Sequence, residues 1–303
     1  MTDFEAKKAI IDIGKRMYLK GFVAANDGNI TCRVGPKTFW TTPTGVSKGF
    51  MTPEMLVKID ITGKVLLGNR KPSSEVKMHL RVYQENPEIM AVTHAHPPVS
   101  TAYAAAGIAL EEPILTESVV NLGVVPIARY AEPGTQEVPD SIAPYCKTHN
   151  AVLLANHGAL TWGKDIYEAF YRLESVEYYA TLLMYTGRII GQQKPLSCGQ
   201  IDNLLQTRNK LGITGGGVPP CSLTSNNTED VITNRQTSLE KRVHPVEKSG
   251  LKGVTPIVRP SDKEPCGCSS RGSIPAIEPD KAAKTKEQII AEVVRRVVSQ
   301  LES

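Results

Sequence analysis

Residues 89–98 read Ile-Met-Ala-Val-Thr-His-Ala-His-Pro-Pro, and the fold prediction starts from this stretch. Its apolar and β-branched residues predict a strand from Ile89 to His96, which the two prolines end. Side chains two apart in a strand point to the same face, so His94 and His96 would project together. Two neutral imidazole nitrogens on one face can share an ion at the ~2.0–2.1 Å distance that zinc prefers. The stretch therefore predicts a strand that carries two metal ligands.

The rest of the first 213 residues alternates between helical and strand patterns. Apolar residues recur with helical spacing from Phe4 to Leu19, and Gly21 ends that pattern. A serine cap at Ser73 or Ser74 would open a helix just before Glu75. The other predicted strands are 30–40, 57–61 and 151–155, and the other predicted helices are 166–185 and 201–211. Together these patterns predict one α/β domain over residues 1–213.

A third metal ligand is predicted just after the strand at 151–155. His157 lies there in the sequence Asn156-His157-Gly158, and Gly158 would permit a sharp turn that aims the imidazole ring. Three histidines leave a fourth position open for a carboxylate, water or substrate, which is typical of catalytic rather than structural zinc. An isolated His-x-His pair is more often two histidines without a metal. His79 lies one helical turn after Glu75, which favours a packing or supporting role, and His149 and His244 are predicted to lie at the surface.

The composition excludes several function classes. The formal net charge is +4, and no basic block interleaved with aromatic residues occurs, so no nucleic-acid partner is expected. The first ten residues lack the apolar run of a signal peptide, and no stretch approaches the ~20 apolar residues of a membrane span. The six cysteines have no framework spacing, which favours a reducing compartment. The sequence predicts a soluble cytoplasmic protein that does not bind membranes.

The composition changes after residue 213. Residues 214–283 contain many prolines, a Gly-Gly-Gly run at 215–217 and few aliphatic side chains, so a flexible linker is predicted. Apolar residues then recur with helical spacing in residues 284–303, with charged residues mostly off that stripe. A short amphipathic helix is predicted there. The alternatives for this helix are packing on its own domain or pairing in an oligomer.

Six motifs of residues 1–213 resemble, in order and spacing, the class II aldolase/adducin family, and most closely its L-fuculose-phosphate aldolase type. They are Gly28-Asn29-Ile30-Thr31, Thr42-Pro43-Thr44-Gly45, Lys71-Pro72-Ser73-Ser74-Glu75, Ala91-Val92-Thr93-His94-Ala95-His96-Pro97, Tyr130 with Gly134-Thr135, and Leu153-Leu154-Ala155-Asn156-His157-Gly158. The resemblance implies a three-layer α/β/α domain around a central, largely antiparallel sheet. It also implies a homotetramer and one zinc ion per subunit.

The resemblance also implies a role for each matching residue. Glu75 would be both a metal ligand, with His94, His96 and His157, and the catalytic acid/base. The substrate phosphate would be bound by six small or hydroxyl-bearing residues, Gly28, Asn29, Thr44, Gly45, Ser73 and Ser74. Small residues and hydroxyl groups let donors approach phosphate oxygens, and a helix N-terminus presents free N–H groups to them.

The implied reaction is reversible cleavage of a ketose 1-phosphate between C3 and C4. L-Fuculose 1-phosphate or L-rhamnulose 1-phosphate would give dihydroxyacetone phosphate and L-lactaldehyde. The metal would stabilise the enediolate charge, and Glu75 would protonate its carbon. The chain departs from the family where a tyrosine handles the C4 oxygen: Leu115–Glu117 holds none, and a second family tyrosine is replaced near Leu211. Thr116 or Glu117 could substitute.

Two other functions remain open from the sequence. Pentulose-phosphate 4-epimerases, of which L-ribulose-5-phosphate 4-epimerase is one, share the fold that the resemblance implies, but they have Asp at the position of Glu75. A non-catalytic scaffold domain, as in adducin, would not need the three histidines and the glutamate. The presence of Glu75 favours the aldolase over the epimerase, and the complete donor set favours an enzyme over a scaffold.

The C-terminal segment resembles the encapsulation peptides that direct enzymes into bacterial microcompartments. The apolar stripe of residues 284–303 would bind a shell protein or another cargo protein. This resemblance implies that the enzyme acts in the lumen of a microcompartment within the cytoplasm.

Overall fold

The computed structural model describes residues 1–221. The predicted linker beyond 221 and the predicted helix at 284–303 lie outside the described residues. One eight-stranded sheet runs through the described chain, in the order β4-β3-β2-β1-β5-β8-β7-β6. All its neighbouring strands are antiparallel except β6 and β7, which are parallel. The strands are β1 Asn29–Gly35, β2 Thr38–Thr41, β3 Val57–Asp60, β4 Val65–Leu67, β5 Ala91–Ala95, β6 Ile127–Ala128, β7 Ala151–Leu154 and β8 Gly158–Gly163.

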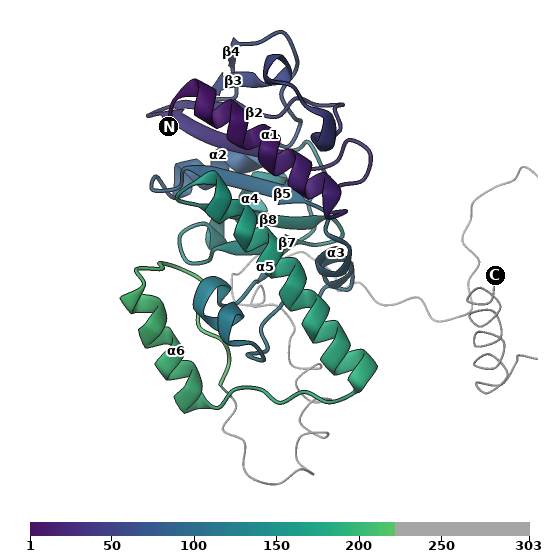
Figure 1. The fold of residues 1–303 in the computed structure, drawn as a ribbon, viewed down its shortest axis with the longest axis vertical. Helices are drawn as coiled ribbons and strands as arrows, with labels where there is room; N and C mark the ends of the chain where they lie inside the picture. Colours follow the sequence, from purple (N-terminus) through teal and green to yellow (C-terminus); the bar gives the residue numbers. More distant parts are fainter. Residues whose placement is uncertain (222–303) are drawn as a thin grey trace, which may run out of the picture. The chain divides into compact units, whose positions relative to one another are not determined.

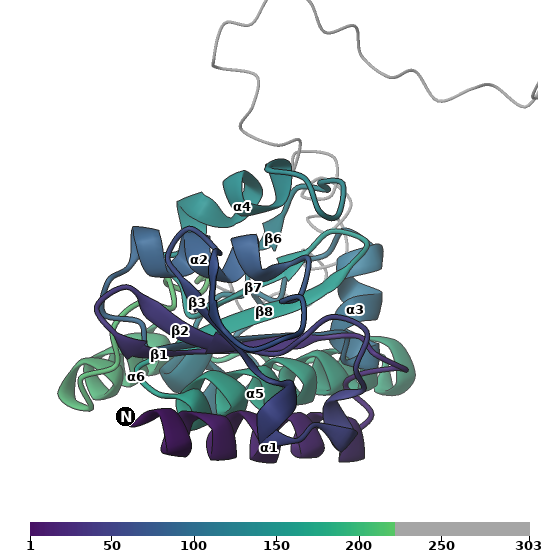
Figure 2. The same ribbon diagram turned by 90° about the horizontal axis from the view of Figure 1, so that it is seen from above.

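Helices cover both faces of this sheet, which confirms the predicted three-layer α/β class (Figure 2). Helices α1 and α5 pack on one face, and α2 and α4 on the other (Figures 1 and 2). The α-helices are α1 Asp3–Leu19, α2 Val76–Glu85, α3 Pro98–Ala105, α4 Glu137–Ile142, α5 Ile166–Met184 and α6 Cys198–Lys210. Shorter helical turns are η1 Lys48–Phe50, η2 Pro53–Met55, η3 Ser118–Leu122, η4 Ala143–Tyr145 and η5 Tyr185–Ile190. Among residues 1–221, no helix is long and apolar enough to cross a membrane.

The central strands are buried on both faces because their side chains alternate between two cores. In β5, Ala91 belongs to the core under α1 and α5, whereas Val92 belongs to the core under α2. Leu153 and Leu154 of β7 divide in the same way. Successive strand residues point to opposite faces, so continuous apolar runs are required here. The strand that carries the histidines therefore lies between two packed layers.

Side-chain caps fix where the long helices begin. Thr2 and Glu5 form a capping box at the start of α1: Thr2 Oγ1 accepts from Glu5 N at 3.3 Å, and Glu5 Oε2 accepts from Thr2 N at 2.8 Å. Asp165 caps α5 by accepting hydrogen bonds from Tyr167 N and Glu168 N. These contacts satisfy N–H groups that have no partner inside the helix.

Three local predictions differ from the structure. The segment predicted as one strand over 30–40 is a hairpin, β1–β2, which turns at Pro36-Lys37. No serine side chain caps α2: its N-cap residue is Glu75, and Ser73 Oγ instead accepts a hydrogen bond from Glu75 N at 3.3 Å. Strand β8 follows His157 directly and was not predicted, because it is a run of only six residues that begins and ends with glycine.

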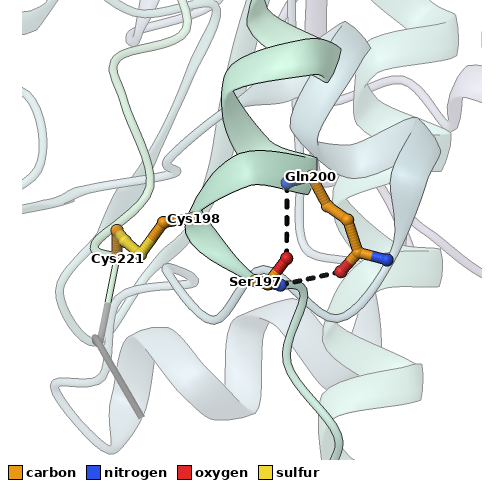
Figure 3. The surroundings of a disulfide bond; sticks show 4 residues. All are labelled: Ser197, Cys198, Gln200 and Cys221. Atoms are coloured by element: carbon orange, nitrogen blue, oxygen red, sulfur yellow. Dashed lines mark hydrogen bonds between the residues drawn. A yellow bond between two sulfur atoms is a disulfide. The ribbon is translucent and has the colours of Figure 1, made fainter.

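The described chain ends at a disulfide bond. Cys221 is bonded to Cys198, the first residue of α6, beside the Ser197–Gln200 capping box (Figure 3). This pairing departs from the expectation of unpaired cysteines, which rested on spacing alone; Cys32 and Cys146 are buried and free. Residues just past 213 also contact the domain: Gly216 N donates to Thr148 O at 2.9 Å. Hydrogen bonding to the domain thus continues beyond the predicted boundary, which remains a prediction from composition.

Candidate metal centre

Two parts of the sheet bring the three histidines together. His94 lies in β5 and His96 directly follows it, while His157 lies in the turn between β7 and β8. Strand β8 pairs with β5, so that Ala159 lies opposite Ala95. The tip of the β7–β8 hairpin is therefore held beside the end of β5. This pairing places a residue 61 positions after His96 next to it, as the sequence motifs predicted.

Gly158 is required by close packing. A Cβ at this position would lie 2.5 Å from Ala95 O and 2.6 Å from His96 Cδ2. The residue of the turn with a left-handed backbone conformation is Asn156, with φ 57°. The prediction that Gly158 permits the sharp turn was therefore wrong, because Gly158 does not have a positive φ. Asparagine tolerates this backbone region better than most residues. The glycine is needed because the histidine rings leave no room for a side chain.

The candidate ligand atoms lie within reach of one ion. One nitrogen from each of His94, His96 and His157 can be chosen so that all three lie within 4.8 Å of one another. The Nε2 atoms of His94 and His96 are 3.1 Å apart. Two ligand atoms held ~2.0–2.1 Å from a tetrahedral zinc ion would be about 3.3–3.4 Å apart, so the spacing fits a shared ion.

The protonation of the rings supports the same conclusion. His94 Nδ1 lies 2.9 Å from Ala159 O, and because a carbonyl can only accept, Nδ1 carries the proton. In the neutral ring, His94 Nε2 then has a free lone pair. His96 Nδ1 faces Asp27 Oδ2 at 3.4 Å, which favours the same tautomer there. Two lone pairs facing each other across 3.1 Å are best accommodated by a cation between them.

Burial keeps the histidines in the state that binds metals. His94 is fully buried, and desolvation lowers its pKa to about 3, so the ring is neutral at pH 7. Desolvation also lowers the pKa of His96, with the neighbouring His157 adding to the shift. Neutral imidazole is the form that ligates a divalent ion. His94 and His96 therefore fit a metal ion without prior loss of a proton.

Glu75 lies against the histidine cluster. Its Oε1 is 2.9 Å from His157 Nε2, and its Oε2 is 3.6 Å from His94 Nε2. Burial opposes ionisation of Glu75, but electrostatic interaction with the His94 and His157 rings and hydrogen bonds from His157 and Asn29 outweigh it and hold the pKa of Glu75 well below its usual range. The carboxylate is ionised at neutral pH and can either contact an ion held by the histidines or accept a proton.

Asn29 connects Glu75 to the predicted phosphate residues. It lies opposite His94 in the β1–β5 pair and is buried. Its Nδ2 donates to Glu75 Oε2 at 2.6 Å and to Ser73 Oγ at 3.2 Å. Its Oδ1 is buried and has no hydrogen-bond partner within the described chain. Asn29 thus orients the carboxylate and leaves one acceptor unused.

The remaining predicted phosphate residues lie in loops next to the central strands of the sheet and to α2. Thr44 N donates to Lys71 O at 3.0 Å and Ser73 N donates to Thr42 O at 3.2 Å, so the 42–45 and 71–75 segments are paired. Thr44, Gly45 and Ser74 are exposed, whereas Ser73 is buried. Gly28 has φ 75°, and a Cβ there would lie 2.9 Å from His94 O. Asn29 and Ser73 contact Glu75 directly, and the binding of phosphate by these six residues remains a prediction.

One neighbour of the centre was not predicted, and two residues offered as substitutes for the family tyrosine make no contact with the histidines. Asp27 faces His96, and no spacing rule in the sequence pointed to it. Gly134 and Thr135, which belong to one of the six sequence motifs, line a small hollow together with Glu75. Thr116 and Glu117 are exposed and have no contact with the histidines in the described chain.

His79 is not a ligand in this arrangement. It is fully buried on α2, and its Nδ1 lies 2.9 Å from Thr31 Oγ1, which in turn lies 2.8 Å from Tyr83 Oη. Desolvation lowers the pKa of His79 to about 3. The structure is in agreement with the packing role predicted for it. His149 is half-buried rather than at the surface, and its ring packs edge-on against Tyr145.

This sheet, with a histidine donor set and an adjacent carboxylate, is the arrangement expected of an α/β lyase that handles negative charge on a substrate oxygen. Residues 8–184 match the family model described as Class II Aldolase and Adducin N-terminal domain. The match covers more than half of the chain, and the chain therefore belongs to the class II aldolase and adducin family.

Individual relatives carry different names within this family. The chain is 33% identical over 187 residues to 3-oxo-tetronate 4-phosphate decarboxylase of Haemophilus influenzae, covering 60% of this chain and 88% of that one. It is 33% identical over 172 residues to L-fuculose phosphate aldolase of Methanococcus maripaludis, which covers 57% of this chain and 92% of that relative. A solved structure of L-fuculose 1-phosphate aldolase superposes with a TM-score of 0.63 at 29% identity. The superposition covers 68% of this chain and 96% of that structure. The likeness lies in the domain that holds the histidines.

Proposed function

We propose that this protein is a metal-dependent lyase that generates the enediolate of dihydroxyacetone phosphate from a phosphorylated sugar. The reaction we favour is reversible cleavage of L-fuculose 1-phosphate or L-rhamnulose 1-phosphate to dihydroxyacetone phosphate and L-lactaldehyde. The observation that carries the proposal is the contact of Glu75 with His157 at 2.9 Å, within a cluster of three histidines. This contact places a carboxylate base beside three histidines that could bind a metal ion.

His94, His96 and His157 would hold the divalent ion, and we propose zinc, one per subunit, because three imidazoles suit that ion. A bound divalent ion would supply Lewis-acid stabilisation of negative charge on the substrate oxygens. To act as a ligand through Nε2, His157 would carry its proton on Nδ1 instead, and Glu75 would be free of the hydrogen bond that it now accepts from Nε2. Asn29 would keep holding Glu75 Oε2 from the other side.

Glu75 would move the proton at carbon. Breaking the C3–C4 bond sends its electron pair to C3, so the ketone fragment becomes an enediolate and the other fragment an aldehyde. Protonated Glu75 then delivers its proton to C3, which gives dihydroxyacetone phosphate. In condensation, the ionised carboxylate removes the same proton. The low pKa of Glu75 keeps it ionised in the resting protein, so in the aldol cleavage the proton it delivers to C3 would be the one that the C4 hydroxyl loses as C4 becomes the aldehyde carbon.

The phosphate end of the substrate would lie over three segments that meet beside Glu75. The backbone around Gly28, Gly45 and Ser74 carries no bulky side chains, so its N–H groups would be able to donate to phosphate oxygens, and Thr44 and Ser73 would add hydroxyl groups. Binding the phosphate fixes the distance from the phosphorus to the carbon that accepts the proton. Phosphate binding would thereby position the substrate rather than take part in bond cleavage.

A second reaction is supported by the name of one relative and by the lack of a family tyrosine in this chain. Removal of CO2 from 3-oxo-tetronate 4-phosphate, the substrate named for the H. influenzae relative, leaves the same enediolate of dihydroxyacetone phosphate. The chain lacks a tyrosine at 115–117, where an aldolase would act on the aldehyde oxygen, and Thr116 and Glu117 are exposed. A decarboxylase needs no such residue. We therefore hold decarboxylation as the second candidate function.

One experiment separates these reactions. The purified protein is given fuculose, rhamnulose, ribulose and xylulose phosphates and 3-oxo-tetronate 4-phosphate, while dihydroxyacetone phosphate and CO2 are measured. Triose phosphate with lactaldehyde supports the aldolase, and triose phosphate with CO2 supports the decarboxylase. Epimerised pentulose phosphate without triose phosphate would contradict both. The E75Q variant is the control for background cleavage.

We further propose that the protein forms a homotetramer and that residues 284–303 bind a microcompartment shell protein or another cargo protein. The sequence resemblances support both proposals. Deletion of residues 284–303 should leave turnover unchanged and abolish association with the shell. Loss of turnover in the deletion variant would instead assign this segment to the catalytic domain.

A further inference from the structure

Lys48 is a buried lysine that the reaction described above does not use. It begins η1, and only 2% of its surface is exposed. Helix α1 packs tightly over this turn: a Cβ on Gly14 would lie 2.6 Å from Lys48 O. Lysine is rarely this buried unless its charge is paired. The position of its ammonium group therefore needs a physical reason.

The ammonium group joins two loops that flank the predicted phosphate site. Lys48 Nζ donates to Asn26 O at 2.7 Å and to Val46 O at 2.7 Å. Asn26 lies two residues before Gly28, and Val46 directly follows Gly45. One side chain thus ties the 26–29 loop to the 44–46 loop. The backbone of both loops is held at a fixed separation by these two bonds.

Its positive charge is not paired in the described chain. Lys48 takes part in none of the ion pairs found within residues 1–221, and its two acceptors there are neutral carbonyls. The nearest acidic influences are Asp27 and Glu75, which act at longer range. Asp27 is turned towards His96, and Glu75 towards His94 and His157. Desolvation lowers the pKa of Lys48 to about 8, so the ammonium is still mainly protonated at neutral pH.

A buried charge without a partner is costly, and an apolar side chain of the same length would fill the space at lower cost. The cost is offset when an anion binds nearby. The loops that Lys48 ties carry four of the six residues predicted to hold a phosphate group: Gly28, Asn29, Thr44 and Gly45. A phosphate dianion seated on these loops would complete the charge balance.

We propose that Lys48 is a positioning residue for the substrate phosphate, which holds the 26–29 and 44–46 loops together and supplies the buried positive charge that the phosphate dianion balances. This inference rests on the proposed function. Lys48 acts through the loop backbone, so its removal should weaken binding of the phosphate group in the ground state and transition state alike. Such a change raises KM and leaves kcat nearly unchanged.

The test uses the zinc-loaded full-length protein and inorganic phosphate as the probe, with calorimetry for binding and steady-state kinetics for turnover. In Lys48→Met, the Kd for phosphate and the KM for the sugar phosphate should each rise at least tenfold, with kcat within about threefold and zinc content unchanged. Lys48→Arg, which keeps the charge and donors, should recover part of the affinity. Lys58→Met is the matched control, because Lys58 lies in β3 and the substitution removes the same charge from an ion pair with Asp3 of α1.

Three outcomes would decide the inference. Unchanged phosphate affinity in a folded, zinc-loaded Lys48→Met protein would overturn it and leave the proposed function intact. If Lys48→Met does not fold, Lys48→Gln replaces it, and unchanged phosphate affinity in that variant would overturn the inference equally. A wild-type protein that cleaves no phosphorylated substrate would instead contradict the proposed function, whatever Lys48 does.

Discussion

His94 Nε2 and His96 Nε2 face each other at 3.1 Å, although each ring uses its other nitrogen as a hydrogen-bond donor. Ala159 O holds the His94 ring and Asp27 holds the His96 ring. The two lone pairs are thus directed at a common point before any ion is bound. Supporting contacts of this kind fix ring orientation and raise ligand affinity.

Removal of one of these ligands should abolish metal binding. In His94→Ala, zinc measured by atomic emission should fall from about one ion per chain to a small fraction, because two histidines bind zinc far more weakly than three. Turnover should fall with it. His149→Ala, at a histidine outside the cluster, is the control and should retain its zinc. Full zinc content in His94→Ala would show that the ion is held elsewhere.

Glu75→Gln should separate metal binding from proton transfer. The amide has nearly the same shape but cannot accept the proton, so kcat should fall by roughly 10²–10⁴. The three histidines remain, so zinc content should change little. Exchange of the C3 proton of dihydroxyacetone phosphate with deuterated solvent, followed by NMR, reports the same step without an aldehyde. Exchange at the wild-type rate in Glu75→Gln would remove Glu75 from the acid/base role.

Gly158→Ala should damage the centre through packing. The added methyl group would collide with Ala95 O and His96 Cδ2 and displace the ring. Displacement of a ligand should weaken zinc affinity by about 10–100-fold, as seen for losses of supporting contacts. Gly199→Ala in α6 meets no atom within 4 Å and serves as the control. Equal zinc affinities in the two variants would mean that the turn relaxes freely.

The metal-free protein should lose stability as the pH falls from 6.5 towards 3. The ordinary pKa of histidine is 6.5, whereas burial lowers that of His79 and of His94 to about 3. Between these values the unfolded chain binds protons that the folded chain does not, so unfolding is favoured as pH falls. Each histidine contributes a slope of at most about 1.4 kcal/mol per pH unit. Urea unfolding at several pH values measures it, and His79→Gln should show a shallower slope than wild type.

The Cys198–Cys221 disulfide should stabilise the end of the domain. It closes a loop with a sequence separation of 23, for which chain entropy predicts about 3 kcal/mol. Cys198→Ser and Cys221→Ser should lower the unfolding midpoint equally, and the double variant should lower it no further. A reducing agent should have the same effect on wild type and none on the variants. Additive losses in the double variant would show that the two thiols act separately.

The histidine centre was accessible from the sequence because its signals are local. His94 and His96 share a strand face through simple alternation, and Asn156-His157-Gly158 follows a recognisable buried strand. The pairing of β5 with β8 could not be read in the same way. Strand β8 has only six residues, of which the first and last are glycine, and its pairing with β5 and β7 becomes visible only in the folded chain.

Residues that act through the backbone were less visible. Lys48 has no motif around it, and its role depends on carbonyl groups of two loops that become neighbours only in the folded chain. Asp27 gained significance only once His96 faced it. Ser73 was expected to cap α2 but lies too early in the chain, and its hydroxyl serves Asn29 and Glu75 instead. Spacing rules describe one element at a time and do not report such contacts.

The most direct test of the central claim is the release of dihydroxyacetone phosphate by protein that has been stripped of metal and then reloaded with zinc. The proposed function predicts no release by the stripped protein, recovery with one equivalent of zinc, and no recovery in His94→Ala. Release of the triose phosphate at an undiminished rate by the stripped protein would contradict the account.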